Sequence, residues 1–220
     1  MKDKAKKNAA EKAAQLIKPG MAVGLGSGST VNHLIDYLGK NKPNAVFVAA
    51  SEESMKRAEN AGLNVKKLND LLSPQRPMIP LYIDGADEVD PTYNLIKGGG
   101  GALTREKIIA SASQEFICIV DESKIVKKLG KFPLAVEVIP YASRYVELEL
   151  CEISKEVCLR EKHQTDNGNL IFDVKGLDYS DPLQLETELN NIPGVVENGV
   201  FSLRMPDRVI VGTDEGADYM

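Results

Sequence analysis

Apolar residues occur in continuous runs along the first two-thirds of the chain, and segments of helical periodicity separate the runs. The runs are "MAVGLG" (21–26), "AVFVAA" (45–50), "MIPLYID" (78–84) and "EFICIVD" (115–121). Continuous runs are typical of strands that are buried on both faces of a sheet. Helix signals lie between them, at Ser29 or Thr30, at Ser51 with Gly62 as its stop, and at Thr104. This alternation predicts an α/β domain with a Rossmann-like, mostly parallel sheet and helices on both faces.

The pattern changes after "LGKF" (129–132). The segments that follow are typical of strand, helix, strand, strand, helix and strand, in the order 134–140, 143–153, 156–162, 169–176, 182–192 and 195–204. This order predicts an inserted ferredoxin-like α+β domain, with Asn167-Gly168 as a tight turn. The last apolar run, 208–214, is expected to return to the first sheet. We therefore predict an α/β catalytic domain of residues 1–130 and 206–220 and a small domain of residues 131–205.

Composition and charge narrow the class of protein. The chain has 220 residues, of which 43% are hydrophobic and 27% charged, and a formal net charge of −5. These values are typical of a soluble globular protein and argue against a nucleic-acid surface. No apolar stretch reaches the roughly 20 residues of a membrane helix, and the first residues lack the apolar centre of a secretory signal. We expect a cytoplasmic protein that binds neither nucleic acid nor membrane.

Cysteine and histidine are scarce. Cys118, Cys151 and Cys158 form no C-x-x-C pair, so we expect reduced thiols that serve as small hydrophobic residues. His33 is expected on a helix surface, and His163 is the other imidazole of the chain. Without a Cys/His cluster, no zinc site is predicted.

The first chemical motif is "GLGSGST" (24–30), at the first strand-to-helix junction. Its glycines let the backbone approach a ligand, and its hydroxyl side chains lie beside the free amides of a helix N-terminus, which favours a phosphate. The dinucleotide spacing is broken at Ser29, and no lysine follows Gly28 as a Walker A loop requires. Two alternatives stay open: a nucleotide site with Glu52 or Glu53 on the ribose, and a turn that serves packing alone.

The second motif is "DGADEVD" (84–90), at the carboxyl end of the third strand, where ligands bind in open α/β sheets. Gly85 lets the chain turn so that Asp84 and Asp87 could face one cavity. Two close carboxylates can hold different protonation states, which suits proton transfer between sugar oxygens. The alternatives are a solvated acidic loop that caps a helix, or a divalent-metal site built from Asp84, Asp87, Glu88 and Asp90.

The third motif is "KGGGGALTREK" (97–107). The glycine amides can point at an anion, Lys97 adds a mobile positive charge, and Glu106 falls in the first turn of the next helix. A carboxylate beside amide donors can remove a proton from a carbon next to a carbonyl, with the amides or Lys97 stabilising the enediolate oxygen. Alternatively, Glu106 only complements the helix dipole. Arg105 and Lys107 are expected on a solvated face.

Together with "VDESK" and "LGKFPLAVEVIP", these motifs, in this order and with these intervals, resemble the type A ribose-5-phosphate isomerase family. The resemblance runs over nearly the whole chain and includes "TDNGN" and "IPGVVENGVF" in the inserted domain. It implies the aldose-ketose isomerisation of ribose 5-phosphate and ribulose 5-phosphate in the pentose phosphate pathway, without a metal or an organic cofactor. We also expect a homodimer, with a tetramer as the alternative.

Residue roles are implied by the resemblance, position by position. Glu106 is implied as the general base that moves a proton between C2 and C1. Asp84, Asp87 and Lys97 are implied to help ring opening and proton transfer at oxygen. The implied substrate-binding residues form three loops and one lysine: Ser27, Gly28, Ser29 and Thr30; Asp84, Gly85, Ala86 and Asp87; Lys97, Gly98, Gly99 and Gly100; and Lys124.

Two other functional classes are the rivals. A non-catalytic sugar-phosphate sensor would keep the phosphate loop without a positioned base, but it would carry a DNA-binding helix-turn-helix, for which the sequence offers no basic domain. A coenzyme-A transferase would use a glutamate to attack an acyl group. A thioester exchange assay would distinguish it from an isomerase.

Overall fold

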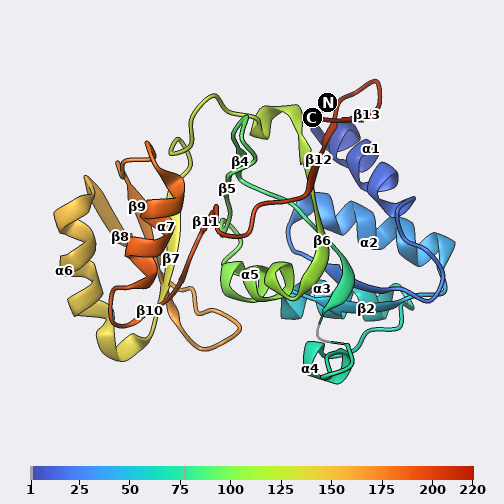
Figure 1. The fold of residues 1–220 in the computed structure, drawn as a ribbon, viewed down its shortest axis with the longest axis horizontal. Helices are drawn as coiled ribbons and strands as arrows, with labels where there is room; N and C mark the ends of the chain where they lie inside the picture. The colour runs from blue at the N-terminus through green and yellow to red at the C-terminus, as the bar shows by residue number, and fades with distance from the viewer. Residues whose placement is uncertain (1, 77) are drawn as a thin grey trace. The chain divides into compact units, whose positions relative to one another are not determined.

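The computed structural model describes residues 2–76 and 78–220, and Figure 1 shows its elements coloured along the chain. The chain divides into two units. The large unit comprises Met1–Gly85, Arg105–Lys124 and Pro206–Met220, and the small unit comprises Ala86–Thr104 and Ile125–Met205. The second unit is therefore inserted into the first, and the chain passes between them four times.

The large unit is built on a six-stranded sheet. Its strands are β1 (Ala22–Leu25), β2 (Val46–Ala49), β3 (Ile79–Asp84), β6 (Ser113–Asp121), β12 (Arg208–Gly212) and β13 (Ala217–Tyr219). The order is β13-β12-β6-β3-β1-β2, and every pair is parallel except β12 with β13. The four predicted strands and the predicted return of the last apolar run are confirmed.

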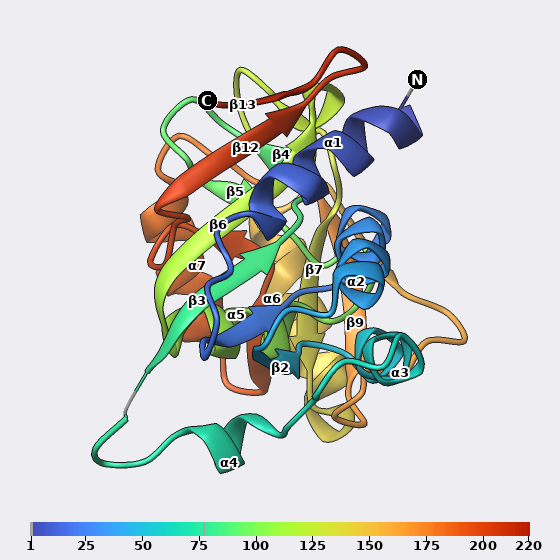
Figure 2. The ribbon, with the colours of Figure 1, turned by 90° about the vertical axis from the view of Figure 1, so that its right-hand side faces the viewer.

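Helices cover both faces of this sheet. They are α1 (Lys2–Ala14), α2 (Ser29–Asn41), α3 (Glu52–Asn60) and α5 (Leu103–Ser111), while the short α4 (Leu68–Leu71) has no buried residue. Val23 and Leu25 of β1 belong to the core cluster that includes the buried residues of α2 and all but Ala5 of the buried residues of α1. Gly24, between them, points to the opposite face of the sheet, since successive strand residues alternate between faces. A Cβ on Gly24 would lie 2.6 Å from Ile109 of α5, which places α5 on that face. Figure 2 shows α1 running beside β12, on the face of the sheet that α1 and α2 cover.

The helix boundaries agree with the sequence signals in part. Ser51 caps α3 by accepting the N–H of Ser54 at 3.0 Å, as predicted. The α2 helix begins at Ser29, and its N-cap is Gly28, with a φ of 88°, so the predicted cap at Ser29 or Thr30 is wrong. Glycine takes this position because the backbone is in the left-handed region there.

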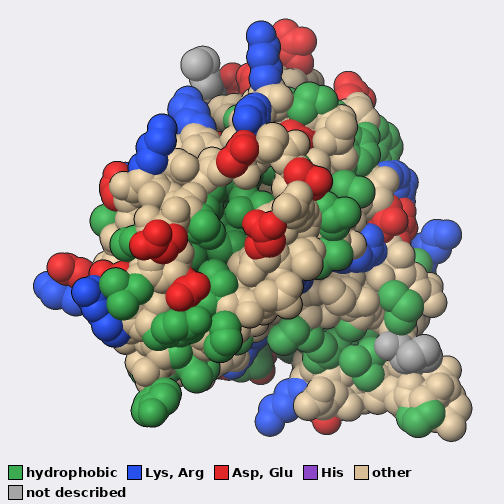
Figure 3. All heavy atoms as spheres, turned by 60° about the vertical axis from the view of Figure 1, so that its left-hand side comes forward, with side chains coloured by type: hydrophobic (Ala, Val, Ile, Leu, Met, Phe, Trp, Pro, Cys, Tyr) green, Lys and Arg blue, Asp and Glu red, His purple; other side chains and the backbone are tan. Residues whose placement is uncertain are grey.

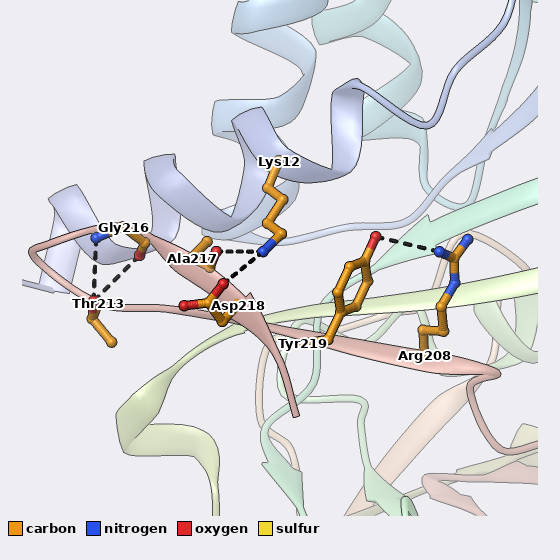
Figure 4. Close-up of polar contacts among 7 residues, drawn as sticks. All are labelled: Lys12, Arg208, Thr213, Gly216, Ala217, Asp218 and Tyr219. Carbon is orange, nitrogen blue, oxygen red and sulfur yellow. Dashed lines mark hydrogen bonds and ion pairs between the residues drawn. The ribbon is translucent and has the colours of Figure 1, made fainter.

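The C-terminal strand β13 is fastened to α1 (Figure 4). Lys12 Nζ donates to the carbonyl of Ala217 at 2.6 Å and pairs with Asp218 at 2.9 Å. The ring of Tyr219 lies between two cations, 4.9 Å from Lys12 Nζ and 5.4 Å from the Arg208 guanidinium. Exposed cation–π contacts contribute about 0.5–1 kcal/mol each, so these side chains stabilise the edge of the sheet.

The small unit has the predicted ferredoxin-like order. It contains β7 (Leu134–Val138), α6 (Ser143–Ile153), β8 (Glu156–Leu159), β9 (Leu170–Lys175), α7 (Pro182–Asn190) and β10 (Val195–Asn198). These strands form an antiparallel sheet in the order β10-β7-β9-β8. A second sheet in the order β11-β5-β4 joins β4 (Glu88–Val89), β5 (Leu95–Ile96) and β11 (Val200–Phe201). The 3-10 turn η2 (Pro140–Ala142) also lies in the small unit, whereas the 3-10 turn η1 (Glu122–Lys124) belongs to the large unit.

The boundaries of the two units differ from those of the predicted domains. The prediction places residues 1–130 and 206–220 in one domain and residues 131–205 in the other. Residues 86–104 and 125–130 group with the small unit. The reason is strand pairing, because β5 pairs with both β4 and β11, and β11 belongs to the inserted segment. Residues 1 and 77 of the predicted first domain lie outside the described residues.

The burial of the cysteines agrees with the prediction from composition at one position of three, and His33 lies on a helix as predicted. Cys118 is buried in β6, as expected for a small hydrophobic residue, but Cys151 and Cys158 are exposed, so that expectation is wrong for both. Cys158 lies on β8, an edge strand of its sheet. His33 lies on α2, with its Nε2 2.9 Å from Asp3 Oδ1. In the described part of the chain, no helix has the length and apolar character needed to cross a membrane.

Candidate active site

The strand order of the large unit marks a place for a ligand. β1 pairs with β2 on one side and with β3 on the other, so the loops after β1 and β3 leave the sheet where the strand order reverses. Open α/β sheets bind ligands in this crevice. The N–H of Ser27, after β1, donates to Asp84 Oδ1, at the end of β3, at 3.0 Å. The structure therefore joins the first two sequence motifs at the switch point.

Asp84 is fully buried at the end of β3. Its Oδ1 also accepts the N–H of Gly85 at 2.7 Å, and its Oδ2 accepts the hydroxyl of Tyr82. Burial, followed by the charges of Asp84 and Glu106, raises the pKa of Tyr82 well above its usual value, which keeps this hydroxyl a donor. A Cβ on Gly26 would lie 1.8 Å from Asp84 Oδ1, so only glycine fits there. The alternative of a solvated acidic loop is wrong for Asp84.

Glu106 lies in the first turn of α5 and is only 3% exposed. Its Oε1 accepts the hydroxyl of Ser27 at 2.6 Å. Ser27 therefore contacts both predicted acids of the large unit, Asp84 through its N–H and Glu106 through its Oγ. A carboxylate that is shielded from water and oriented by a hydroxyl is suited to accept a proton from a bound carbon acid.

The neighbours of Glu106 on α5 are less exposed than expected. Lys107 is 7% exposed, so its predicted place on a solvated face is wrong. Arg105 pairs with Glu52 at 2.8 Å, with their side chains 31% and 44% exposed. The charge of Glu52 is thus used within the protein, which weakens the alternative in which this residue binds a ribose.

The N-terminus of α2 carries the predicted phosphate loop. Gly28 and Ser29 are exposed, while Ser27 and Thr30 are half-buried. Lys6 Nζ, from α1, donates to Ser29 Oγ at 2.9 Å. Sequence reasoning missed Lys6, because nothing in its own stretch indicates a distant partner. Its positive charge adds to the favourable field of a helix N-terminus for an anion.

Lys124 follows β6 in the large unit. It ends the 3-10 turn η1 and is half-buried. The turn is fixed by Asp121, whose Oδ1 accepts the N–H of Ser123 at 3.0 Å. The predicted contact between Lys124 and a phosphate stays a prediction.

In the small unit, Lys97 follows β5 and is 3% exposed. Its N–H donates to the carbonyl of Gly199 at 2.9 Å, and its Nζ lies 5.5 Å from the centre of the Phe201 ring. The prediction that Lys97 carries a mobile charge is therefore wrong. The pairing of β5 with β11 fixes the backbone beside Lys97, and the Phe201 ring packs against its buried side chain. Lys97 is a positioned cation.

The shape of the loop favours glycine at three of the four positions after Lys97. Gly98 and Gly101 have φ values of 103° and 81°, which side chains rarely adopt. A Cβ on Gly101 would lie 2.2 Å from His163 Nε2, and one on Gly99 would lie 2.9 Å from Asp87 Oδ1. The N–H of Gly99 donates to Asp87 Oδ2 at 2.9 Å. The structure therefore joins Asp87 to the third motif.

The rest of the acidic motif supports the fold. Glu88 is 3% exposed and accepts the N–H groups of Gly130 and Phe132 at 2.7 and 2.6 Å. Asp90 is 9% exposed and accepts hydrogen bonds within its own turn. Among residues 2–76 and 78–220, no group of three or more His, Cys, Asp or Glu residues is arranged to hold a metal ion. Asp84 and Asp87 belong to different units, and their shared cavity stays a prediction.

A family model described as ribose 5-phosphate isomerase A (phosphoriboisomerase A) matches residues 46–216. The chain belongs to this isomerase family. It is 52% identical to ribose-5-phosphate isomerase A of Acidithiobacillus ferrooxidans over 215 residues, 97% of this chain and 96% of the relative. The same-named protein of Legionella pneumophila (strain Corby) is 49% identical over 215 residues, 96% of each chain. The resemblance that the motifs carry is confirmed.

Solved members of the ribose-5-phosphate isomerase A family have the same fold. The Neisseria gonorrhoeae structure has a TM-score of 0.95 at 42% identity and covers 100% of this chain and 97% of its own. A D-ribose-5-phosphate isomerase in complex with phospho-erythronic acid has a TM-score of 0.93 at 41% identity and covers 100% and 99%. The predicted fold class is confirmed, and the sensor alternative is not favoured.

Proposed function

We propose that this chain is an aldose-ketose isomerase that interconverts ribose 5-phosphate and ribulose 5-phosphate, with Glu106 as the general base. One observation carries the assignment of the base: Glu106 is buried at the start of α5, and the Ser27 hydroxyl of the phosphate loop orients it at 2.6 Å. Membership of the isomerase family supplies the reaction class.

In the proposed reaction, Glu106 removes the proton from C2 of the open-chain aldose and returns it to C1. The electron pair of the broken C–H bond forms the C1–C2 double bond of an enediolate, and the carbonyl oxygen takes up the negative charge. We propose that the glycine amides and Lys97 stabilise this oxygen. Asp84 and Asp87 are proposed to move protons between the sugar oxygens during ring opening and isomerisation.

The phosphate group is proposed to bind at the N-terminus of α2, on Ser27, Gly28, Ser29 and Thr30, with Lys124 as a further donor. The free amides of the helix and the nearby Lys6 support this place, because the net charge of the chain is negative. The related enzyme solved with phospho-erythronic acid supports a phosphorylated sugar-like ligand.

We propose a cytoplasmic homo-oligomer that acts in the pentose phosphate pathway. The small unit exposes apolar side chains over η2 and α6, where Tyr141 is 99%, Tyr145 47% and Leu148 50% exposed. Figure 3 shows that hydrophobic side chains gather with acidic ones on the face it draws. Apolar surface of this kind supports self-association. Sedimentation velocity tests this proposal, and a monomer at micromolar concentration would contradict it.

The assignment is tested by following ketose formation from ribose 5-phosphate in the presence of a chelator. Because amides and Lys97 are proposed to stabilise the enediolate, we expect full activity with the chelator present. Loss of activity that a single divalent ion restores would contradict the metal-free mechanism. Absence of any ketose with the untreated protein would contradict the proposed function itself.

A further inference from the structure

The glycine loop of the small unit is held by a side chain that no sequence motif singled out. Arg160 directly follows β8 and lies 18% exposed against Asp173 of β9, which is 27% exposed. Arg160 Nε donates to Asp173 Oδ2 at 2.9 Å, and Nη2 donates to Asp173 Oδ1. This two-pronged pair fixes the plane of the guanidinium on a strand inside the sheet.

The same guanidinium also holds the glycine loop. Arg160 Nη1 donates to the carbonyls of Gly98 at 3.1 Å and Gly99 at 3.3 Å. Four of the five N–H groups of a guanidinium are used in this way, two on Asp173 and two on successive carbonyls. A lysine could not reproduce the arrangement, because one ammonium cannot match both the carboxylate and the two carbonyls in a fixed plane.

Holding the carbonyls also sets the amides. In a trans peptide the C=O and the following N–H point in opposite directions, so the N–H groups of Gly99 and Gly100 are directed away from Arg160. The N–H of Gly99 meets Asp87 Oδ2 at 2.9 Å, which holds the Gly98-Gly99 peptide at both ends. Arg160 also holds the carbonyl of the next peptide, and the exposed Gly100 presents its N–H on the side opposite Arg160.

We propose that Arg160 is a positioning residue for the isomerisation, and that it acts by aiming the N–H of Gly100 at the oxyanion of the enediolate. This inference rests on the proposed function of the loop. It gives the inserted unit a task in the reaction, since β8 and β9 carry the arginine and its anchoring carboxylate. Pre-aligned donors act mainly on the transition state, so their loss lowers turnover more than it weakens binding.

The test compares Arg160→Met, Arg160→Lys and Asp173→Asn with a control variant, Arg144→Met. Arg144 is an exposed arginine of α6 that pairs with Glu147 across one helical turn. We expect kcat to fall about 10–100-fold in Arg160→Met, in line with the cost of misplaced donors, with KM changed less than about threefold. Arg160→Lys and Asp173→Asn should lose less, and Arg144→Met should match the wild type.

The outcomes separate the roles. Wild-type kcat in Arg160→Met, with only a lower melting temperature, would make the arginine structural and overturn the proposal, as would a change in KM alone. If Arg160→Met does not fold, Arg160→Lys and Asp173→Asn test the proposal in its place. A wild-type kcat in both of these variants would overturn the proposal. A wild-type protein and an Arg144→Met variant that both form no ketose would instead refute the proposed function.

Discussion

Replacing Gly26 by alanine tests the link between the fold and the candidate site. A Cβ at this position would lie 1.8 Å from Asp84 Oδ1 and 1.9 Å from its Cγ. Ordinary contact needs about 3.5 Å, so the carboxylate must move by roughly 1.5 Å or more. Its hydrogen bonds from Ser27 and Gly85, at 3.0 and 2.7 Å, would then break, since hydrogen bonds are lost beyond about 3.5 Å.

The expected cost follows from the burial of Asp84. Hydrogen bonds to a charged group contribute about 1.5–3 kcal/mol each, and separating a buried charge from its partners costs about 3–5 kcal/mol. We therefore expect Gly26→Ala to lower the free energy of unfolding by about 3–5 kcal/mol. For a chain of this size that corresponds to a fall in melting temperature of roughly 6–20 °C. Isomerase activity should fall with it, because Ser27 also orients Glu106.

Thermal unfolding and the ketose assay measure both effects. Gly216→Ala is the matched control, because a Cβ there meets nothing within 4 Å and the φ of Gly216 is not in the left-handed region. We expect the control to lie within about 0.5 kcal/mol of the wild type, as is usual for surface changes. If Gly26→Ala were as stable and as active as this control, the close packing of Asp84 against Gly26 would contribute neither to stability nor to activity, which would refute the reasoning.

Two further predictions concern Tyr82 and Lys124. The pKa of Tyr82 is raised in the folded protein. Below about pH 10 the phenol keeps its proton in the folded and the unfolded states, so its ionisation does not change the free energy of unfolding. Above about pH 10 the unfolded phenol loses its proton first, and the free energy of unfolding falls as the pH rises. Tyr82→Phe should be less stable than the wild type near pH 8, because phenylalanine cannot donate to Asp84 Oδ2, and it should lose stability less steeply above pH 10, because it has no phenol to ionise. Parallel slopes in thermal unfolding would refute this. Lys124→Ala should chiefly raise the KM for ribose 5-phosphate in steady-state kinetics. A change in turnover with unchanged KM would require another role for Lys124.

Sequence patterns predicted the elements that have long apolar runs and missed those that do not. The strands at 79–84 and 113–121 were recognisable because they are buried on both faces. The α1 helix was not predicted, because its buried face consists of alanines such as Ala5, Ala9 and Ala13, which give no marked apolar period. Strands of two residues, such as β4 and β5, are too short to show any alternation.

The candidate site was predictable as a set of residue types but not as a network. The glycine runs and Glu106 stand out in the sequence, since four successive glycines beside two charges require an explanation. The hydrogen bond between Ser27 and Glu106 spans 79 positions, and Arg160 reaches the glycine loop across 62. Such pairs depend on the strand order, which local patterns do not determine.

The central claim is that Glu106 is the general base, and turnover of Glu106→Gln tests it most directly. Glutamine keeps the size of the side chain and can still accept the Ser27 hydrogen bond, but it cannot take the proton from C2. Glu149→Gln, an exposed position on α6, is the matched control. We expect Glu106→Gln to fold, to bind ribose 5-phosphate, and to lose on the order of 10²–10⁴-fold in kcat, while Glu149→Gln retains it. In deuterated water the wild type should place label at C1 of ribulose 5-phosphate. A folded Glu106→Gln variant with near wild-type turnover would contradict the account and move the base to Asp84 or Asp87.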